Sequence, residues 1–370
     1  MLLTRKGLEQ ATHLLVASWR AAEIQRLAPG STVWDQTAGL GADALALARA
    51  GLAIEVSELD PLHAACCEAN LAALGFEVHV RVGDSRRQEV TADLILLDPD
   101  RRADSGTSAR GAQGGGRRRL DPSSFSPPVE DWRAAIDAHA GAVVKLPPGL
   151  DPAELVAPLG LTDLPHRWTW TEAGNSLREL TLWTGSLAPA GEPGRAAVRL
   201  FDSPATAPGG PCAPGPGVRA VVLSPDASRP PRPLVELDPD ALTLLAEPRA
   251  SVLVAGLSER AGQELGLEVL DPSCAYLASD REDLPGEAGP FLDLFRVIGS
   301  SPLDRKRVRK LLVQHGIGPL TVKKRGVDET SDQLAAKFGQ KRGRLGLAIV
   351  SPTPAGRRLY LVERLPLAPG

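Results

Sequence analysis

The feature that most constrains the fold is a repeated alternation of short apolar runs with helical segments over the first half of the chain. Five strands are expected, at residues 32–35, 53–57, 77–82, 93–97 and 142–145. Helices are expected between them, at 42–50, 61–74 and 128–140. The run at 93–97 is mostly apolar, as in a strand that is buried on both faces. Repeated strand–helix units of this kind form a parallel, doubly wound sheet with helices on both faces.

Two further strands, 166–171 and 177–184, are joined by a turn at 173–175 and predict an antiparallel pair at the end of the sheet. The expected sheet therefore has seven strands. A helix at 13–26 precedes the sheet, and Thr12 is placed to cap that helix.

The remaining segments predict the division of the chain into domains. Residues 103–119 are too polar and glycine-rich to form a core, and 201–217 reads as a Pro/Gly-rich linker. Residues 218–223 suggest a strand and 237–267 a mostly helical region. An α+β module follows, with strands at 291–298, 320–324, 344–350 and 357–363 and helices at 304–315 and 331–338. The expected parts are a helical segment (1–30), an α/β domain (31–187), a connecting region (188–290) and the α+β domain (291–365).

A glycine-rich loop at 35–41, with the sequence DQTAGLG, joins the first strand to the first helix of the sheet. Glycine lets the backbone turn sharply and approach a ligand, and the helix N-terminus that follows favours a carboxylate. Glu58 and Asp84 end the next two strands, where carboxylates can accept hydrogens from ribose hydroxyls and an adenine amino group. The candidate cofactor-binding residues are Asp35, Thr37, Ala38, Gly39, Gly41, Asp43, Glu58, Leu59, Asp84 and Ser85.

The same loop also satisfies the weak G-x-G-x-x-A pattern of dinucleotide-binding folds, through Gly39, Gly41 and Ala44. In that fingerprint the first glycine follows the strand almost directly, whereas residues 35–38 intervene here. A dinucleotide site also gives no reason for the Asp-Pro pair at 98–99. The pattern therefore favours S-adenosylmethionine over NAD(P) as the cofactor.

The end of the fourth strand carries the motif DPDRR at 98–102, on the edge where open α/β sheets place their chemistry. Asp98 is placed to orient an acceptor or take its proton, and the proline after it stiffens the backbone. The two arginines are candidate clamps for a phosphate or carboxylate, with ion pairs to nearby aspartates as the alternative. A phosphate contact or a packing role fits Lys145. The candidate catalytic residues are Asp98, Pro99, Arg101, Arg102 and Lys145.

The net charge of −3 hides a strong asymmetry along the chain. Residues 296–344 hold thirteen Lys and Arg against four Asp and Glu, a local charge of +9 that leaves −12 elsewhere. Such a basic block often faces nucleic acid, although a solvated surface has the same composition. RNA is therefore the expected partner. The candidate substrate-binding residues are Gln10, Arg117, Arg118, Lys323, Lys324 and Arg325.

Cysteine usage and hydropathy narrow the setting in which the chain works. The four cysteines include the adjacent pair 66–67 and offer no metal-binding or disulfide framework, which favours a reducing cytoplasm. No stretch reaches the roughly 18 apolar residues that span a bilayer. No metal and no membrane partner is therefore expected, and the oligomeric state stays open.

Taken together, these motifs resemble the bacterial methyltransferases that carry a C-terminal THUMP-like domain. The resemblance rests on LEQAT at 8–12, the glycine loop through ALALA at 44–48, DPDRR at 98–102, KLPPG at 145–149 and LTVKKRG at 320–326. One departure is Asp100, where that family usually carries alanine. The resemblance implies a class I methyltransferase fold, S-adenosylmethionine as cofactor and RNA as substrate.

Three functions remain in competition. The first is methylation of an RNA base by direct in-line transfer, in which positioning does most of the work. The second is methylation of a small molecule or protein by the same core. The third is RNA binding by a non-catalytic relic, which the complete set of acids at the strand ends argues against.

Overall fold

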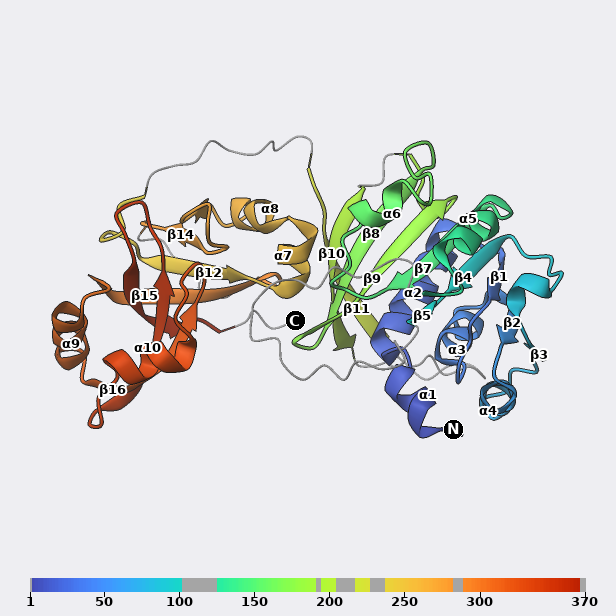
Figure 1. Cartoon of the computed structure of the whole chain (residues 1–370), viewed down its shortest axis with the longest axis horizontal. Coiled ribbons are helices and arrows are strands. Elements are labelled where there is room, and N and C mark those ends of the chain that lie inside the picture. The colour runs from blue at the N-terminus through green and yellow to red at the C-terminus, as the bar shows by residue number, and fades with distance from the viewer. Residues whose placement is uncertain are drawn as a thin grey trace. The chain divides into compact units, whose positions relative to one another are not determined.

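A computed structural model of the chain describes residues 2–101, 125–190, 194–203, 217–226, 237–281 and 289–366. The chain forms two compact units, Met1–Val222 and Leu223–Gly370 (Figure 1). Within the described residues no helix is long and apolar enough to cross a membrane. The segment 103–119, expected as a loop without a core, lies outside the described residues.

The first unit is built on a sheet that contains the predicted seven-stranded arrangement. Its strands run in the order β3-β2-β1-β4-β7-β9-β8, and β9 is antiparallel to both neighbours while the other pairs are parallel. The bounds are β1 (Thr32–Asp35), β2 (Ala53–Glu58), β3 (Val80–Val82), β4 (Leu94–Leu97), β7 (Gly141–Leu146), β8 (His166–Ala173) and β9 (Ser176–Gly185). The predicted fold class is thereby confirmed for this unit.

Two more strands extend this sheet, and they correct the expected connecting region at 188–290. Strand β10 (Arg195–Ser203) pairs in parallel with β8, and β11 (Gly217–Leu223) lies beyond it. The sequence pattern does not predict β10, because the segments on both sides of this strand are rich in proline and glycine, as in a linker. A separate two-stranded ribbon joins β5 (Asp100–Arg101) to β6 (Phe125–Ser126), directly after the end of β4.

Both faces of the sheet are covered, as the apolar run of β4 predicts. Leu94 and Leu96 pack into one core cluster with helix α2 (Leu14–Leu27) and helix α3 (Ala42–Arg49). Ile95 and Leu97 point to the opposite face, since side chains alternate along a strand, and they are equally buried. Burying each such side chain contributes about 1.5–3 kcal/mol.

The helices begin where local capping is available. Asp60 accepts the backbone N–H groups of residues 62 and 63 and starts α4 (Pro61–Ala72). His13, rather than the expected Thr12, caps α2, and a further helix, α1 (Arg5–Gln10), precedes it. The other helical segments of this unit are η1 (Ser85–Arg87), α5 (Val129–Asp137) and α6 (Ala153–Val156). Thr12 is thus free for another role.

The second unit holds a seven-stranded sheet in the order β13-β14-β12-β15-β18-β17-β16. Its C-terminal elements follow the prediction: β15 (Leu292–Pro302), α9 (Arg305–Gln314), β16 (Ile317–Lys324), α10 (Ser331–Phe338), β17 (Arg344–Ser351) and β18 (Arg358–Arg364). The mostly helical reading of 237–267 is wrong in part. This stretch contains β12 (Leu244–Pro248) and two short helices, α7 (Ala250–Ala255) and α8 (Ser258–Gln263), and β13 (Glu268–Val269) and β14 (Leu277–Ser279) follow.

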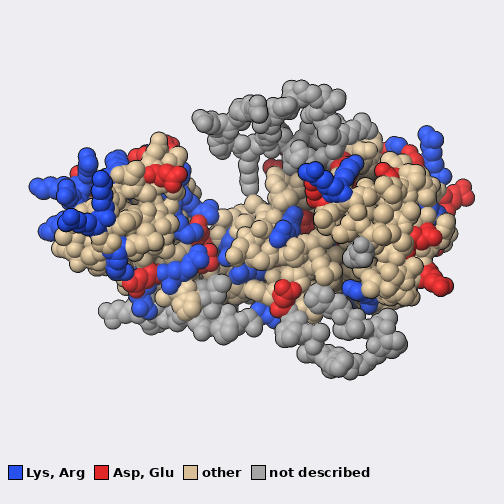
Figure 2. All heavy atoms as spheres, turned by 90° about the horizontal axis from the view of Figure 1, so that it is seen from below, with Lys and Arg blue, Asp and Glu red and all other residues tan. Residues whose placement is uncertain are grey.

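Helix α9 lies on one face of this second sheet with its basic side turned outward. Its apolar residues Val308, Leu311 and Leu312 are buried in a cluster with α10, β16, β17 and β18. The next residues along β17 and β18, such as Ile349 and Tyr360, belong to a cluster on the opposite face. Lys and Arg side chains gather over the α9 end of the unit (Figure 2). Packing of the apolar stripe therefore decides which way the positive charge faces.

Candidate active site

The carboxyl ends of neighbouring parallel strands bring four acids to one edge of the first sheet. Asp35 and Glu58 end β1 and β2, while Asp84 and Asp98 follow β3 and β4. These four strands are neighbours in the order β3-β2-β1-β4. The edge is the one where open α/β sheets bind their ligands.

The glycine loop closes tightly onto β2 and α4. Gly39 and Gly41 have φ angles of 56° and 88°, in the left-handed region that favours glycine. A Cβ at Gly41 would lie 2.7 Å from Cys67 Sγ, whereas a Cβ at Gly39 would meet nothing within 4 Å. The N–H of Gly39 donates to Glu58 Oε2 at 2.7 Å. The loop is therefore pressed against α4 at Gly41 and open at Gly39.

The acids of β2 and β3 differ in how they are held. Glu58 is buried and accepts a second backbone hydrogen bond, from Asp60 N at 2.9 Å, so each carboxylate oxygen keeps a lone pair for a ribose hydroxyl. Leu59 beside it is 68% exposed and offers an apolar surface to an adenine ring. Arg86 Nη2 lies 2.6 Å from Asp84 Oδ2, and this hydrogen-bonded guanidinium holds the pKa of Asp84 below its ordinary value. Ser85 begins the short helix η1 there.

Asp35 is the acid most in need of a cationic ligand. Its side chain is 2% exposed, and Oδ1 accepts the N–H of Thr37 at 3.3 Å. Its second oxygen is buried without a hydrogen-bond partner among the described residues. Burial, with Asp43 nearby, raises the pKa of Asp35 to about 8. An ammonium group would supply both the missing donor and the missing charge, and the amino group of S-adenosylmethionine fits this requirement.

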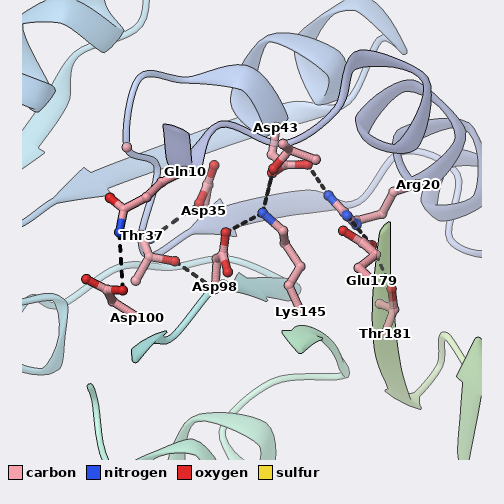
Figure 3. A network of polar contacts seen from close by, with 12 residues as sticks. Gln10, Arg20, Asp35, Thr37, Asp43, Asp98, Asp100, Lys145, Glu179 and Thr181 are labelled. Carbon is pink, nitrogen blue, oxygen red and sulfur yellow. Dashed lines mark hydrogen bonds and ion pairs between the residues drawn. The ribbon is translucent and has the colours of Figure 1, made fainter. Parts of the chain in front are cut away.

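A buried network of charged side chains lies beside these acids (Figure 3). Lys145 of β7 donates to Thr12 Oγ1 at 2.6 Å, to Asp43 Oδ2 at 2.9 Å, and to Asp98 Oδ2. Asp43 accepts from Thr12 at 2.6 Å and forms an ion pair with Arg20. Burial alone raises the pKa of Asp43, but Arg20 and Lys145 outweigh it and hold that pKa at about 2.

This network reassigns two residues that the sequence offered as ligand contacts. An ammonium has three N–H donors, and all three of Lys145 are used within the protein, so none is left for a phosphate. Asp43 likewise accepts from Thr12, Arg20 and Lys145, so its carboxylate is engaged within the protein.

The acceptor edge is built around Asp98. Its backbone N–H donates to Thr37 Oγ1 at 2.7 Å, which ties the end of β4 to the glycine loop. Its side chain is 40% exposed, and Pro99 after it is buried. Burial raises the pKa of Asp98, and the contact with Lys145 offsets only part of that effect. Gln10 of α1 reaches Asp100 at 3.3 Å, so α1 borders this edge.

The remaining predicted site residues are placed as follows. Arg102, Arg117 and Arg118 lie outside the described residues, and of Arg101 only the backbone, in β5, is described. In the second unit Lys323 and Arg325 form ion pairs with Glu247 at 2.5 and 3.2 Å, and Lys324 donates to the carbonyl of Val327 at 2.9 Å. The charges of the 323–325 motif are therefore engaged within the protein.

Sequence reasoning missed two members of the network, Arg20 and Glu179. Arg20 is 1% exposed and bridges Asp43 to Glu179 of β9, which also accepts from Thr181 at 2.8 Å. A signal was present, because Arg20 sits four residues after Val16 and four before Ile24, on the apolar face of α2. An arginine in such a stripe requires a buried anionic partner.

The fold and the row of acids at its ligand-binding edge define a class I S-adenosylmethionine-dependent methyltransferase. The chain is 30% identical over 353 residues to two proteins from Mycobacterium tuberculosis strains, CDC 1551 / Oshkosh and H37Rv, each described as an uncharacterized S-adenosylmethionine-dependent methyltransferase. The match covers 94% of this chain and 84% of each relative. The chain therefore belongs to the methyltransferase family that these proteins represent.

Two further comparisons agree with this assignment. Residues 292–364 match the family model described as THUMP domain-like. A crystal structure of a protein assigned as a methyltransferase from Porphyromonas gingivalis W83 has a TM-score of 0.71, with 18% identity over 98% of this chain and 83% of that chain. At that identity the likeness shows a shared fold.

Proposed function

We propose that this enzyme methylates an RNA base, with the acceptor placed at Asp98 and the RNA backbone held by the second unit. The observation that carries the RNA substrate is a set of exposed basic side chains without ion-pair partners among the described residues. We call this set the α9 surface. It consists of Arg305, Lys306, Arg307, Arg309, Lys310, Lys341, Arg342 and Arg344.

The members of the α9 surface lie close together although they come from two segments. Five of them are in α9 itself, and Arg344 pairs with Ile317, which starts the strand directly after α9. Phosphate contacts of this kind supply most of the sequence-independent affinity for nucleic acid. The α9 surface thus replaces the 323–325 motif as the expected RNA contact.

The position of Asp98 at the end of β4, on the ligand-binding edge of the sheet, supports the proposed transfer step. When bound, S-adenosylmethionine supplies a methyl group on a positively charged sulfur. Attack by the acceptor atom would form a bond to that methyl carbon as the carbon–sulfur bond breaks, and the electron pair of the broken bond would stay on sulfur. The acceptor proton passes to the carboxylate of Asp98. Asp35 and Glu58 hold the amino and ribose groups, so the protein contributes mainly positioning.

The test uses the full chain, methyl-labelled S-adenosylmethionine, and RNA from a strain that lacks the gene. We expect label in one nucleoside, which nucleoside mass spectrometry would find missing from the deletion strain and present in its parent. The double variant Lys306→Glu/Lys310→Glu should lower the rate at least tenfold while cofactor binding is unchanged. The matched control is Arg296→Glu/Lys337→Glu, which changes the charge equally outside the α9 surface. Label that enters protein or small molecules and not RNA would overturn the proposal.

A further inference from the structure

The buried network contains two residues from the N-terminal helical segment, which contributes no strand to the sheet. Thr12 immediately precedes the cap of α2, and Arg20 lies within α2. Their partners come from β7, α3 and β9 (Figure 3). Segments far apart in the sequence therefore meet beside Asp98, and the N-terminal segment has a function besides packing.

Thr12 fixes the position of the lysine that touches Asp98. Its hydroxyl accepts a hydrogen bond from Lys145 at 2.6 Å, so its own hydrogen is left for Asp43 Oδ2, also at 2.6 Å. Lys145 is buried, and a buried N–H without an acceptor is unfavourable by about 1–3 kcal/mol. With three acceptors in place, the ammonium has one orientation, and one of its hydrogens points at Asp98 Oδ2.

Arg20 sets the charge balance of the same network. It forms ion pairs with Asp43 and Glu179. Because Arg20 compensates part of the negative charge of Asp43, Lys145 also remains paired with Asp98. The network holds two cations, Arg20 and Lys145, and three carboxylates, which leaves one uncompensated negative charge. Asp98 is its most exposed carboxylate, at 40%, and its Oδ1 has no hydrogen-bond partner among the described residues. The excess negative charge therefore faces the acceptor edge.

We propose that Thr12 and Arg20 are positioning residues for methyl transfer, which hold Lys145 so that Asp98 stays ionised with one oxygen free for the acceptor. The charged groups that act on Asp98 are Lys145 of β7, Asp43 of α3 and Glu179 of β9, with Asp35 and Arg20 behind them. The claim that this positioning helps methyl transfer rests on the proposed function. The claim that Thr12 and Arg20 keep Asp98 ionised does not.

The experiment compares Thr12→Val, which removes the hydroxyl and nearly keeps the shape, with Thr12→Ser, which keeps the hydroxyl. The readout is the pH titration of the Asp98 carboxyl carbon by 13C NMR in the full chain with S-adenosylhomocysteine, assigned through Asp98→Asn. We expect Thr12→Val to raise the pKa of Asp98 by roughly one unit, because Lys145 is held less firmly. Thr12→Ser should titrate like the parent chain.

The titration is independent of the identity of the acceptor, so a failure to methylate RNA leaves it interpretable. Equal pKa values for Asp98 in all three chains would overturn the proposal. An Asp98 pKa shift of the same size in Thr12→Ser would also overturn the proposal. That result would mean that the shape of the side chain at position 12, and not its hydroxyl, controls the pKa. If Thr12→Val does not fold, Thr12→Ala replaces it in the same comparison. Where RNA is methylated, kcat should fall in Thr12→Val while KM for the cofactor stays unchanged.

Discussion

At the scale of single residues, this site depends on ionisable groups whose charges the fold controls. Asp43 is buried yet ionised, because two cations contact it. Asp35 is also buried but contacts no cation among the residues that the structure describes, and burial raises its pKa to about 8. The pKa values of these two aspartates, eight residues apart, are therefore shifted in opposite directions, and only Asp35 is suited to receive a cationic ligand.

The raised pKa of Asp35 predicts a pH dependence of cofactor binding. Below pH 8 the side chain is largely protonated in the unliganded protein, and an ammonium ligand requires the carboxylate. Affinity for S-adenosylhomocysteine, which carries the same amino group, should increase roughly tenfold between pH 6.5 and 8. Isothermal calorimetry at several pH values would measure this, and Asp35→Asn should bind weakly with a flat profile over that range.

The same group should affect stability with the opposite sign. Its pKa in the folded, unliganded state lies above the value in the unfolded chain, so its contribution to stability is present at low pH. That contribution is lost as pH rises through about 8. Saturating ligand should reverse this trend, because the bound state favours the carboxylate. Denaturant unfolding of the parent chain and of Asp35→Asn, with and without ligand, separates this group from the other titrating groups.

Asp98→Asn tests the proposed proton acceptor directly. The amide keeps the size of the side chain but cannot take a proton, so methyl transfer should fall by about 10²–10⁴-fold. Cofactor affinity should stay within about twofold, because the proposed role of Asp98 is toward the acceptor and not the cofactor. Transfer rates and calorimetry on the same preparation check both points. Full activity of Asp98→Asn would remove Asp98 from the reaction.

At the scale of elements, the contact of the glycine loop with α4 positions the cofactor edge. Gly41 caps α3 with a φ of 88°, and the Sγ of Cys67 in α4 occupies the space where a Cβ would lie. Close approach of loop and helix therefore needs glycine on one side. It also explains why Cys67 is fully buried rather than reactive: burial raises the pKa of its thiol.

Gly41→Ala should destabilise the first unit for two reasons, backbone strain and the clash with Cys67. Gly51→Ala is the matched control, since its φ is 81° and a Cβ there meets nothing within 4 Å. We expect about 1–2 kcal/mol for the control, from strain alone, and a larger loss for Gly41→Ala. Adding Cys67→Ala to Gly41→Ala removes Sγ, so this double variant should recover the difference between the two stability losses. Denaturant unfolding of the parent chain, the two glycine variants and the double variant would measure these losses. Equal losses at the two glycines would disprove the packing argument.

At the scale of the whole molecule, the chain separates charge between its parts. The +9 of residues 296–344 is concentrated in the second unit, while the rest of the chain carries −12. The structure sorts the basic residues further, because Lys323 and Arg325 pair with Glu247, whereas the α9 surface has no ion-pair partner in the described part of the chain. The proposed RNA-binding unit therefore rests on local charge, and the proposed face rests on burial and ion pairing.

This separation predicts how RNA binding depends on salt. Each neutralised phosphate contributes about −0.7 to the slope of log affinity against log salt for single strands. The double variant Lys306→Glu/Lys310→Glu should make that slope shallower by roughly 1.4. Fluorescence anisotropy with labelled RNA between low and moderate salt gives the slopes. The control Arg296→Glu/Lys337→Glu should keep the parent slope, and an equal change in both would mean that net charge alone matters.

Sequence alone predicts the alternating first domain, the row of acids and the C-terminal module. These features rest on local patterns, because strand and helix periodicity, caps and turn residues are properties of neighbouring positions. It did not determine β10, whose flanks have linker composition, or the strand within 237–267. Those strands are stabilised by pairing with distant segments, which a local pattern does not contain.

The contacts of the charged side chains, by contrast, do not follow from local sequence patterns. From sequence, Lys145 fits a phosphate contact or a packing role, Thr12 a helix cap and the 323–325 motif an RNA contact, while Arg20 has no assigned role. In the structure Lys145 contacts Thr12, Asp43 and Asp98, Thr12 also donates to Asp43, and Lys323 and Arg325 pair with Glu247. The physical reason is that the state of a charged group depends on burial and on the charge beside it. Those neighbours come from positions up to 159 residues apart, brought together only when the sheet is assembled.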